Sequence, residues 1–199
     1  IFYDFETYKV TKTEILEDGS IKEIIEHIPY LCCYVGDDDV IWSFNGEECG
    51  KLMLEHITRR RANLSKKEII NLIAHNGGKY DCNFLIKYFK NIEPIEKGSK
   101  YMSLKGKFND YKFNCKDSLL LISSPLSKFP KMFKIKDTIK EVISYNMYDK
   151  TDCIKRNFIP IEEGLEWIRK DGLDENQFLE NLKKWNLKID FNNTYSCLA

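Results

Sequence analysis

The opening segment Ile1–Thr7 constrains this chain more than any other stretch. Its apolar and aromatic residues are typical of a buried β-strand. Asp4 and Glu6 interrupt that pattern at positions i and i+2, and because side chains alternate across a strand, both carboxylates point to the same face. Paired carboxylates repel each other unless a proton or a cation lies between them, and Mg²⁺ is a natural occupant near neutral pH. Taken alone, the spacing also occurs on the solvated face of an edge strand.

Length and composition indicate a globular protein. The chain has 199 residues, enough for one domain with a hydrophobic core. Hydrophobic residues make up 43% and charged residues 31%, which is ordinary for a globular chain. Neither a membrane-spanning apolar run nor a signal peptide pattern is present, so no membrane partner is expected. The chain lacks an initiator Met and begins inside a strand pattern, which we interpret as a piece of a longer protein.

The formal charges and the cysteines exclude two other classes of protein. The net charge is +0, so any binding of nucleic acid depends on local basic patches. Seven cysteines are scattered without a Cys-x-x-Cys pair. The odd number and the spacing favour free thiols in a reducing, intracellular compartment over a disulfide framework. A structural zinc site would need paired ligand spacing, which the sequence does not show.

The remaining chain alternates between strand and helix patterns. The strand patterns are separated by turn residues, and the helical patterns have apolar residues at helical spacing. Leu52, Met53, His56 and either Leu54 or Ile57 are expected to face the core from the first helix. The expected elements are a hairpin over 8–27 turning at 17–20, strands over 29–35 and 40–44 around a solvated acidic turn, a helix over 47–61, strands over 69–74 and 111–115, a helical region over 161–185 broken near 171–172, and a last helix from about 190 that carries Tyr195.

A second informative segment follows the strand over 69–74. This strand breaks at Gly77 and Gly78, after which Tyr80 and Asp81 begin a helix with apolar residues through Phe89. Asp81 therefore lies in the first turn of a helix close to a strand end. The helix dipole favours an anion there, and the position can face a crevice beyond the sheet. The alternative interpretation is an ordinary carboxylate at a helix start.

A basic segment over 125–140 interleaves five lysines with Phe129, Met132 and Phe133. Basic and aromatic residues together suit a phosphate backbone and unstacked bases. The same pattern is typical of an amphipathic helix whose lysines extend from an apolar face into water.

In combination, these motifs resemble the 3′→5′ proofreading exonuclease domain of family B DNA polymerases, and within them the protein-primed branch of bacteriophages, linear plasmids and viruses. Asp4-Phe5-Glu6-Thr7 is similar to the first exonuclease motif. His75-Asn76 through Tyr80-Asp81 is similar to the second, with Tyr80 where the family usually has Phe. Asp117-Ser118-Leu119, with the basic segment over 125–140, is similar to the Ser-Leu segment that helps to hold single-stranded DNA.

The resemblance implies an α/β, ribonuclease H-like fold with a mixed central sheet flanked by helices. It implies that residues 1–199 form a single 3′→5′ exonuclease domain, a fragment of a longer polymerase. Two Mg²⁺ or Mn²⁺ ions would hydrolyse 3′-terminal nucleotides. The implied partners are the 3′ end of single-stranded DNA, the rest of the polymerase and a terminal protein primer. The implied residues are Asp4, Glu6 and Asp81 as metal ligands, Tyr195 as the contact to the attacking water, and Thr7, His75, Asn76, Tyr80, Ser118, Leu119 and Lys140 as contacts to the terminal nucleotides.

The third family motif, Tyr-x-x-x-Asp, is incomplete because Ala199 stands where the Asp is expected after Tyr195. Three explanations remain open: an introduced Asp→Ala change, loss of the residue in this lineage, or a true Asp just beyond a register shifted by one position. With Ala199 the resemblance implies binding of single-stranded DNA with slow digestion. The alternative functions are a degenerate DNA-binding or scaffold domain, a stand-alone exonuclease or RNase of the same fold, and a wholly structural protein.

Overall fold

The computed structural model describes residues 1–63, 65, 67–135, 158–184 and 194–196. Lys140 and Ala199, both expected at the site, lie outside these residues. Within the described part, five cysteines are free thiols, as the spacing predicted. None of the described helices combines the length and the apolar character that a membrane crossing requires.

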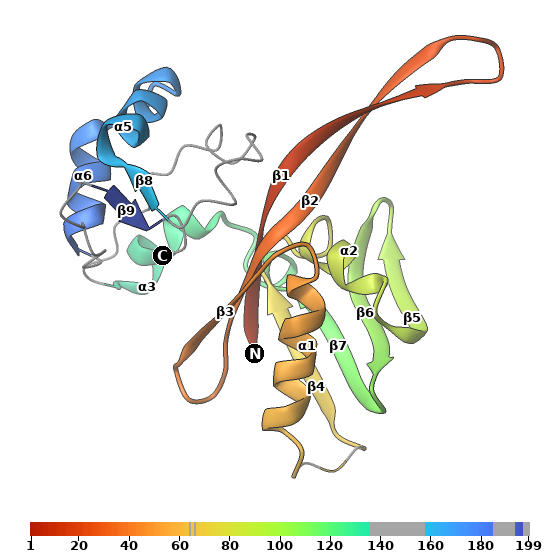
Figure 1. Ribbon diagram of the computed structural model, residues 1–199. Coiled ribbons are helices and arrows are strands. Elements are labelled where there is room, and N and C mark those ends of the chain that lie inside the picture. Colours follow the sequence, from red (N-terminus) through yellow and green to blue (C-terminus); the bar gives the residue numbers. More distant parts are fainter. Residues whose placement is uncertain (64, 66, 136–157, 185–193, 197–199) are drawn as a thin grey trace. The chain divides into compact units, whose positions relative to one another are not determined.

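A mixed seven-stranded sheet dominates the structure, with strand order β3-β2-β1-β4-β7-β6-β5 (Figure 1). β4 runs parallel to β1 and to β7, whereas β3 is antiparallel to β2, and β6 is antiparallel to both β5 and β7. The strands are β1 (Phe2–Ile15), β2 (Ile21–Val35), β3 (Ile41–Asn45), β4 (Ile69–Ala74), β5 (Lys90–Lys97), β6 (Lys100–Phe108) and β7 (Tyr111–Asp117). The α/β class with a mixed sheet and helices, expected for a ribonuclease H-like chain, is confirmed.

The core lies between one face of this sheet and two helices, α1 (Cys49–Arg60) and α2 (Asp81–Ile86). Every second residue of the central strands enters it: Tyr3 and Phe5 on β1, and Ile70, Leu72 and Ala74 on β4, are buried. Because strand side chains alternate, the residues between them point to the opposite face. The prediction that Asp4 and Glu6 share a face is confirmed. Asp4, between the buried residues Tyr3 and Phe5, is exposed, and Glu6, which follows Phe5, is half-buried.

Most predicted elements are confirmed, including the hairpin that turns between β1 and β2 and the strands on either side of the acidic turn. One core assignment was wrong, because Leu52 on α1 is 41% exposed. The buried stripe of α1 runs through Cys49, Met53 and Ile57 with four-residue spacing. Leu52 precedes Met53 by one position, about 100° around the helix, and so faces solvent. α2 ends at Ile86, earlier than the helix predicted through Phe89.

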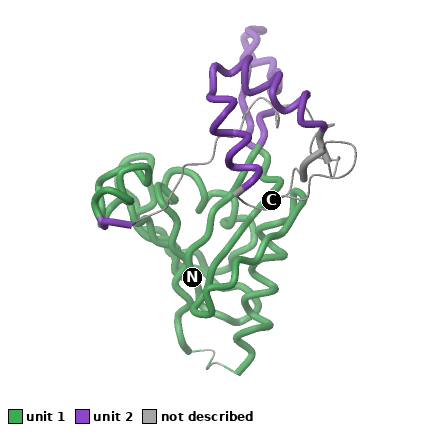
Figure 2. Tube along the Cα trace, turned by 90° about the vertical axis from the view of Figure 1, so that its left-hand side faces the viewer, with its two compact units in different colours: residues 1–7, 28–132 green, residues 8–27, 133–199 purple. Residues whose placement is uncertain are grey.

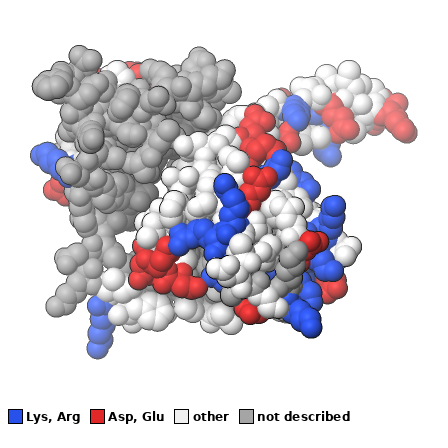
Figure 3. All heavy atoms as spheres, turned by 60° about the horizontal axis from the view of Figure 1, so that its bottom comes forward, with Lys and Arg blue, Asp and Glu red and all other residues white. Residues whose placement is uncertain are grey.

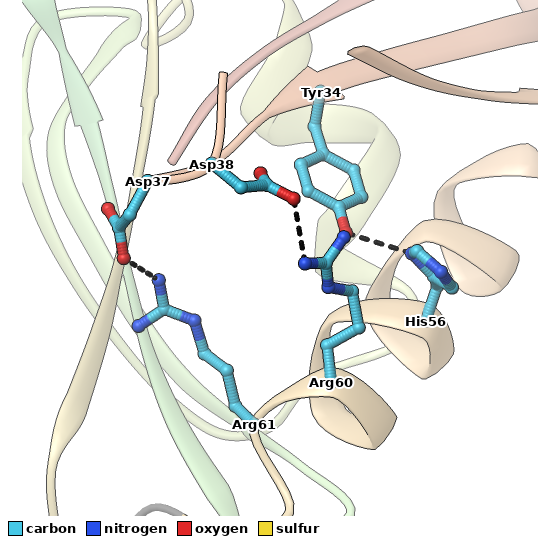
Figure 4. A network of polar contacts seen from close by, with 6 residues as sticks. All are labelled: Tyr34, Asp37, Asp38, His56, Arg60 and Arg61. Atoms are coloured by element: carbon cyan, nitrogen blue, oxygen red, sulfur yellow. Dashed lines mark hydrogen bonds and ion pairs between the residues drawn. The ribbon is translucent and has the colours of Figure 1, made fainter. Parts of the chain in front are cut away.

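The acidic turn after β2 is tied to the end of α1 by two ion pairs, which Figure 4 shows. Asp38 pairs with Arg60 at 2.7 Å and Asp37 with Arg61 at 2.8 Å. The Arg60 guanidinium also lies 5.0 Å from the ring centre of Trp42. The acidic turn predicted between the two strands is therefore present, and its aspartates have a structural role.

The described chain divides into two compact units, coloured separately in Figure 2. The first comprises residues 1–7 and 28–132 and holds the core described above. The second comprises residues 8–27 and 133–199, and its described part includes the outer hairpin of β1 and β2, where Lys12 pairs with Glu26. Its other elements are β8 (Phe158–Pro160), α5 (Ile161–Lys170), α6 (Glu175–Lys184) and β9 (Thr194–Ser196).

The helical region predicted over 161–185 is confirmed, with its break at Gly172, whose φ is +63°. The prediction that Tyr195 lies on a final helix was wrong, because Tyr195 is in strand β9 and pairs with Ile159 of β8. Thr194 and Tyr195 are β-branched and aromatic residues, which favour a strand when a partner strand is present. The sequence around them lacks the apolar spacing that a helix would need.

Candidate active site

The first-motif segment lies on β1, in the centre of the sheet. Tyr3 is 4% exposed and Phe5 is 3% exposed, with their rings edge to face at 6.0 Å. These two aromatic anchors fix the strand on the core, and they hold Asp4 and Glu6 on the other face. The two carboxylates are thus presented by a rigid element rather than by a loop.

Asp81, the carboxylate of the second motif, is 3% exposed in the first turn of α2. Its Oδ1 accepts a hydrogen bond from the backbone N–H of Phe5 at 3.1 Å. Phe5 lies between Asp4 and Glu6, so this bond attaches the second-motif carboxylate to the strand that carries the first motif. The structure therefore brings the two motifs together, although 76 positions separate the bonded residues.

The electrostatics of these carboxylates are those of crowded acids without a compensating cation. Burial, with a smaller contribution from the charge of Asp4, raises the pKa of Asp81 from 3.8 to about 7. Although the Asp4 side chain is open to solvent, the surrounding protein atoms raise the pKa of its carboxyl by desolvation. Both shifts oppose ionisation, and both would be relieved by a nearby positive charge.

Thr7 and Tyr80 provide a second link between the two motifs. The Thr7 hydroxyl and the Tyr80 phenol are joined by a hydrogen bond. The Tyr80 ring lies edge to face with Phe84 of α2 at 5.1 Å, which fixes its position on the helix. Burial raises the pKa of the Tyr80 phenol, with further contributions from the negative charges of Asp81 and Glu6. Tyr80 is therefore a neutral hydroxyl group beside the carboxylates.

Asp117, at the end of β7, holds the loop that precedes Asp81. It is 4% exposed, and its carboxylate accepts three backbone N–H bonds: from Asn76 at 2.8 Å, from Gly78 at 3.3 Å and from Leu119 at 2.9 Å. Asn76 adopts a φ of +65°, a conformation that Asn tolerates better than most residues. Gly78 lies so close to β6 that a Cβ there would be 2.0 Å from the carbonyl oxygen of Tyr101.

From the sequence, Asp117 is only the first residue of the Ser-Leu segment, with no predicted role of its own. A carboxylate that follows a strand directly and precedes a turn is a frequent acceptor for backbone N–H groups. The position of Asp117 at a strand end was therefore the feature of the sequence that could have predicted this role. The second partner, the loop at Asn76 and Gly78, could not be identified because it lies about 40 positions earlier.

His75 and Ser118, both predicted to contact nucleotides, lie together. His75 Nδ1 and Ser118 Oγ are 3.0 Å apart, and the His75 ring meets Phe129 edge to face at 5.3 Å. Phe129 begins the short helix α3 (Phe129–Phe133), which follows the 3₁₀ turns η1 (Ser118–Leu120) and η2 (Leu126–Lys128). His75 Nε2 is buried and has no hydrogen-bond partner among the described residues. A buried, unpaired ring nitrogen is costly, which makes it a candidate contact for a ligand.

The donor types at the site suit divalent cations, because Asp4, Glu6 and Asp81 provide only carboxylate oxygens. Within the described residues, no three His, Cys, Asp or Glu side chains are gathered as a metal ion would require. The motif carboxylates are thus neighbours on adjoining elements and do not form a ready cage. A pocket of about 420 Å³ lies elsewhere, between Tyr34, Asp38, Arg60 and Ile1, and none of the motif residues lines it.

The structure brings together nine of the predicted site residues in the first unit: Asp4, Glu6, Thr7, His75, Asn76, Tyr80, Asp81, Ser118 and Leu119. Tyr195 belongs to the second unit, and only its backbone in β9 is described.

Comparisons with known proteins identify relatives of this sequence. A sequence model of the family "DNA polymerase type B, organellar and viral" matches residues 62–193. A DNA polymerase of Kluyveromyces lactis is 27% identical over 126 residues, covering 58% of this chain and 12% of that polymerase. This chain therefore spans a small part of the relative's length.

Two solved structures of Phi29 DNA polymerase are also similar. The complex with primer-template DNA has a TM-score of 0.45 and 14% identity, over 94% of this chain and 32% of that one. The complex with single-stranded DNA has a TM-score of 0.41 and 18% identity, over 92% and 34%.

Proposed function

The chain belongs to the family of organellar and viral type B DNA polymerases, and on that basis we propose that it contributes the 3′→5′ proofreading exonuclease of such a polymerase. The activity would remove nucleotides one at a time from the 3′ end of single-stranded DNA. A remaining polymerase segment, and a terminal protein primer as in the protein-primed branch that the sequence resembles, would be its partners.

One observation carries this proposal: the hydrogen bond from the Phe5 N–H to the Asp81 carboxylate. It joins a buried acid to the strand residue that lies between Asp4 and Glu6, so the carboxylates of two distant motifs lie on adjoining elements. A purely structural acid at a helix start would not need a neighbouring strand that carries two further acids. Burial, with a smaller contribution from the charge of Asp4, raises the pKa of Asp81 to about 7, and a bound cation would relieve that cost.

Asp4, Glu6 and Asp81 would hold the divalent cations. When bound, the cations supply an activated water and stabilise negative charge on the phosphate and the leaving 3′-oxygen. The protein contributes by fixing Asp4 and Glu6 on a central strand and Asp81 at a helix start, and the three side chains would draw together around the cations on binding. The Phe5 N–H keeps Asp81 in place before any cation arrives.

The surrounding polar side chains would hold the terminal nucleotides. The linked hydroxyls of Thr7 and Tyr80 lie beside the carboxylates and would contact the sugar or the phosphate. His75 would donate or accept through Nε2, since its Nδ1 is already engaged by Ser118. Asn76 and Leu119 are tied through their backbones to Asp117, so one carboxylate holds together the two loops that carry these contacts.

Ala199 would leave this site incomplete, because it stands where the family motif has an Asp. The expected consequence is weaker cation binding and slow digestion by the chain as it stands. The same alanine favours a second candidate, a DNA-binding domain that has lost its catalytic function. The two candidates differ in whether restoring a carboxylate restores cleavage.

The test is a digestion assay with a 5′-labelled single-stranded oligonucleotide and Mg²⁺ or Mn²⁺. We expect the Ala199→Asp chain to shorten the oligonucleotide stepwise from its 3′ end, the unchanged chain to do so far more slowly, and Ala199→Asn to remain slow as the neutral control. Asp4→Asn in the Ala199→Asp background should abolish cleavage.

Two results would count against the proposal. If Ala199→Asp binds the oligonucleotide but does not cleave it, the degenerate binding domain is the better account. If cleavage appears but survives Asp4→Asn, the nuclease activity does not come from this site.

A further inference from the structure

The sheet face opposite the core carries a row of lysines on its outer strands. On β6 and β7 the core receives Leu104, Phe113 and Cys115, so the alternate residues point the other way. Four of those alternate residues are exposed lysines, and β5 adds a fifth at the sheet edge. These residues, called the lysine face below, are Lys90, Lys105, Lys107, Lys112 and Lys116.

The strand register places lysines of neighbouring strands directly opposite one another. Lys107 of β6 is the partner of Lys90 on β5 and also of Lys112 on β7. Side chains directly opposite each other in an antiparallel pair have Cβ atoms about 5 Å apart, and like charges there destabilise the sheet. A three-strand row of cations is therefore an arrangement that the fold alone would disfavour.

Two acidic side chains reach this face, but neither pairs with its lysines. The register of β5 places Glu93 opposite Lys105 and Glu96 opposite Tyr101. Among the described residues, ion pairs involve Lys12, Lys87 and Lys170 but none of the lysines on this face. By contrast, Ser103 and Asn114 on the same face hydrogen-bond to each other at 2.6 Å across the strands.

The lysine face is continuous with the face that carries the first-motif carboxylates. Lys116 is the register partner of Ile73 on β4, and Ile73 is in turn the partner of Phe2 on β1. Asp4 follows Phe2 by two residues and so points the same way. β6 is three strand spacings from β1, about 14 Å across the sheet, and the level of Lys107 and Lys112 lies six residues along the strands from Asp4, roughly 20 Å. The lysines are thus within reach of a single strand of several nucleotides whose 3′ end lies at the carboxylates.

We propose that the lysine face binds the phosphate backbone of single-stranded DNA, on the 5′ side of the nucleotides held at the carboxylates. This inference rests on the proposed function, which supplies the 3′ end at Asp4. Positive charges spaced over adjacent strands match a flexible polyanion, and binding it removes the repulsion between Lys90, Lys107 and Lys112. Asp4 repels phosphate, so the attraction on this face comes from its lysine side.

The experiment measures binding of 5′-fluorescein-labelled (dT)20 and (dT)4 by anisotropy in EDTA, where nothing is digested. The variant is Lys107→Gln with Lys112→Gln, and the matched control is Lys51→Gln with Lys67→Gln, which removes two exposed lysines elsewhere. We expect the variant to bind (dT)20 at least about threefold more weakly than the control does. The slope of log K against log salt concentration should become shallower by roughly 1.4, because each of the two lost contacts to a single strand contributes roughly 0.7. Binding of (dT)4 should be unchanged.

Three results would overturn the proposal. The first is equal affinity and equal salt dependence for variant and control, and the second is the same loss of affinity for (dT)4 as for (dT)20. The third is that poly-glutamate binds as tightly as (dT)20 and loses the same affinity in the variant. The last result would indicate an acidic protein partner. Thermal melting should show the variant at least as stable as the unchanged chain, because a repulsive row has been removed. Since no cleavage is measured, failure of this proposal is distinct from failure of the exonuclease proposal.

Discussion

The carboxylate of Asp81 accepts a hydrogen bond from the backbone N–H of Phe5 at 3.1 Å, and this single contact joins a helix start to the central strand of the sheet. Burial and the charge of Asp4 disfavour the ionised form of Asp81, and the bond from the Phe5 N–H offsets only part of that cost. The stability of the fold should therefore report on the charge of this residue.

We expect Asp81→Asn to stabilise the metal-free chain above neutral pH. Between pH 3.8 and about 7 the folded chain holds a proton on Asp81 that the unfolded chain releases. The free energy of unfolding consequently falls as pH rises through this window, by up to about 1.4 kcal/mol per unit. Asn cannot ionise and retains an acceptor for the Phe5 N–H. Urea unfolding in EDTA from pH 4.5 to 8 measures the difference; an Asp81→Asn chain that is less stable at pH 8 would contradict it.

Divalent cations should stabilise the unchanged chain more than the Asp81→Asn chain. A cation that binds the folded state raises its stability in proportion to RT ln(1 + [L]/Kd), and it would bind the ionised carboxylates. We expect millimolar Mg²⁺ or Mn²⁺ at pH 8 to raise the melting temperature of the unchanged chain and to change that of Asp81→Asn much less. Ca²⁺ and matched NaCl serve as controls for geometry and ionic strength. Equal shifts in both chains would mean that Asp81 is not a ligand.

Asp117→Asn should loosen the loop before Asp81. An amide offers one acceptor oxygen and turns an N–H group toward backbone N–H donors, so at least one of the bonds from Asn76, Gly78 and Leu119 is lost. The expected loss is about 1–3 kcal/mol of unfolding free energy. Amide exchange at those three residues should accelerate more than exchange across β2. Asp39→Asn on the exposed turn is the matched control, and a similar loss there would remove the special role of Asp117.

Gly78→Ala tests the close approach of that loop to β6. The new Cβ would lie 2.0 Å from the carbonyl oxygen of Tyr101, and backbone atoms cannot rotate away as a side chain can. We expect a loss of about 1–3 kcal/mol, or failure to fold. Gly36→Ala is the control, because its nearest contact is Asp38 Oδ1 at 3.5 Å and it should change stability by less than about 0.5 kcal/mol. A comparable loss of unfolding free energy in both variants would show that the close approach of Gly78 to Tyr101 does not exclude a side chain.

The sequence predicted the parts of this structure that depend on local patterns. Alternation predicted the shared face of Asp4 and Glu6, and the glycine pair after β4 predicted the helix that begins at Asp81. Tyr195 was assigned to a helix because its strand partner, Ile159, lies 36 positions earlier and leaves no local signal. Likewise the three donors to Asp117 and the lysine row across β5, β6 and β7 depend on strand register, which periodicity does not give.

His56 gives a pH dependence of the opposite sign to that of Asp81. Its Nδ1 is 2.8 Å from the Tyr34 hydroxyl (Figure 4). The centres of the His56 and Trp42 rings are 4.5 Å apart. Burial lowers the pKa of His56 below 6.5, and the charges of Arg59 and Arg60 lower it further. Cationic and acidic side chains are interspersed over the face of the molecule that Figure 3 shows.

As pH falls through 6.5, the unfolded chain gains a proton on His56 before the folded chain does, so stability decreases on acidification. His56→Gln should abolish this decrease. Because Asp81 acts oppositely in the same range, the comparison belongs in the Asp81→Asn background, where unfolding at pH 5 and 7.5 isolates His56. If NMR shows that His56 titrates at or above pH 6.5 in the folded chain, the prediction is refuted. If it titrates below pH 6.5 but His56→Gln leaves the pH dependence of stability unchanged, the pKa of His56 is lowered in the unfolded chain as well.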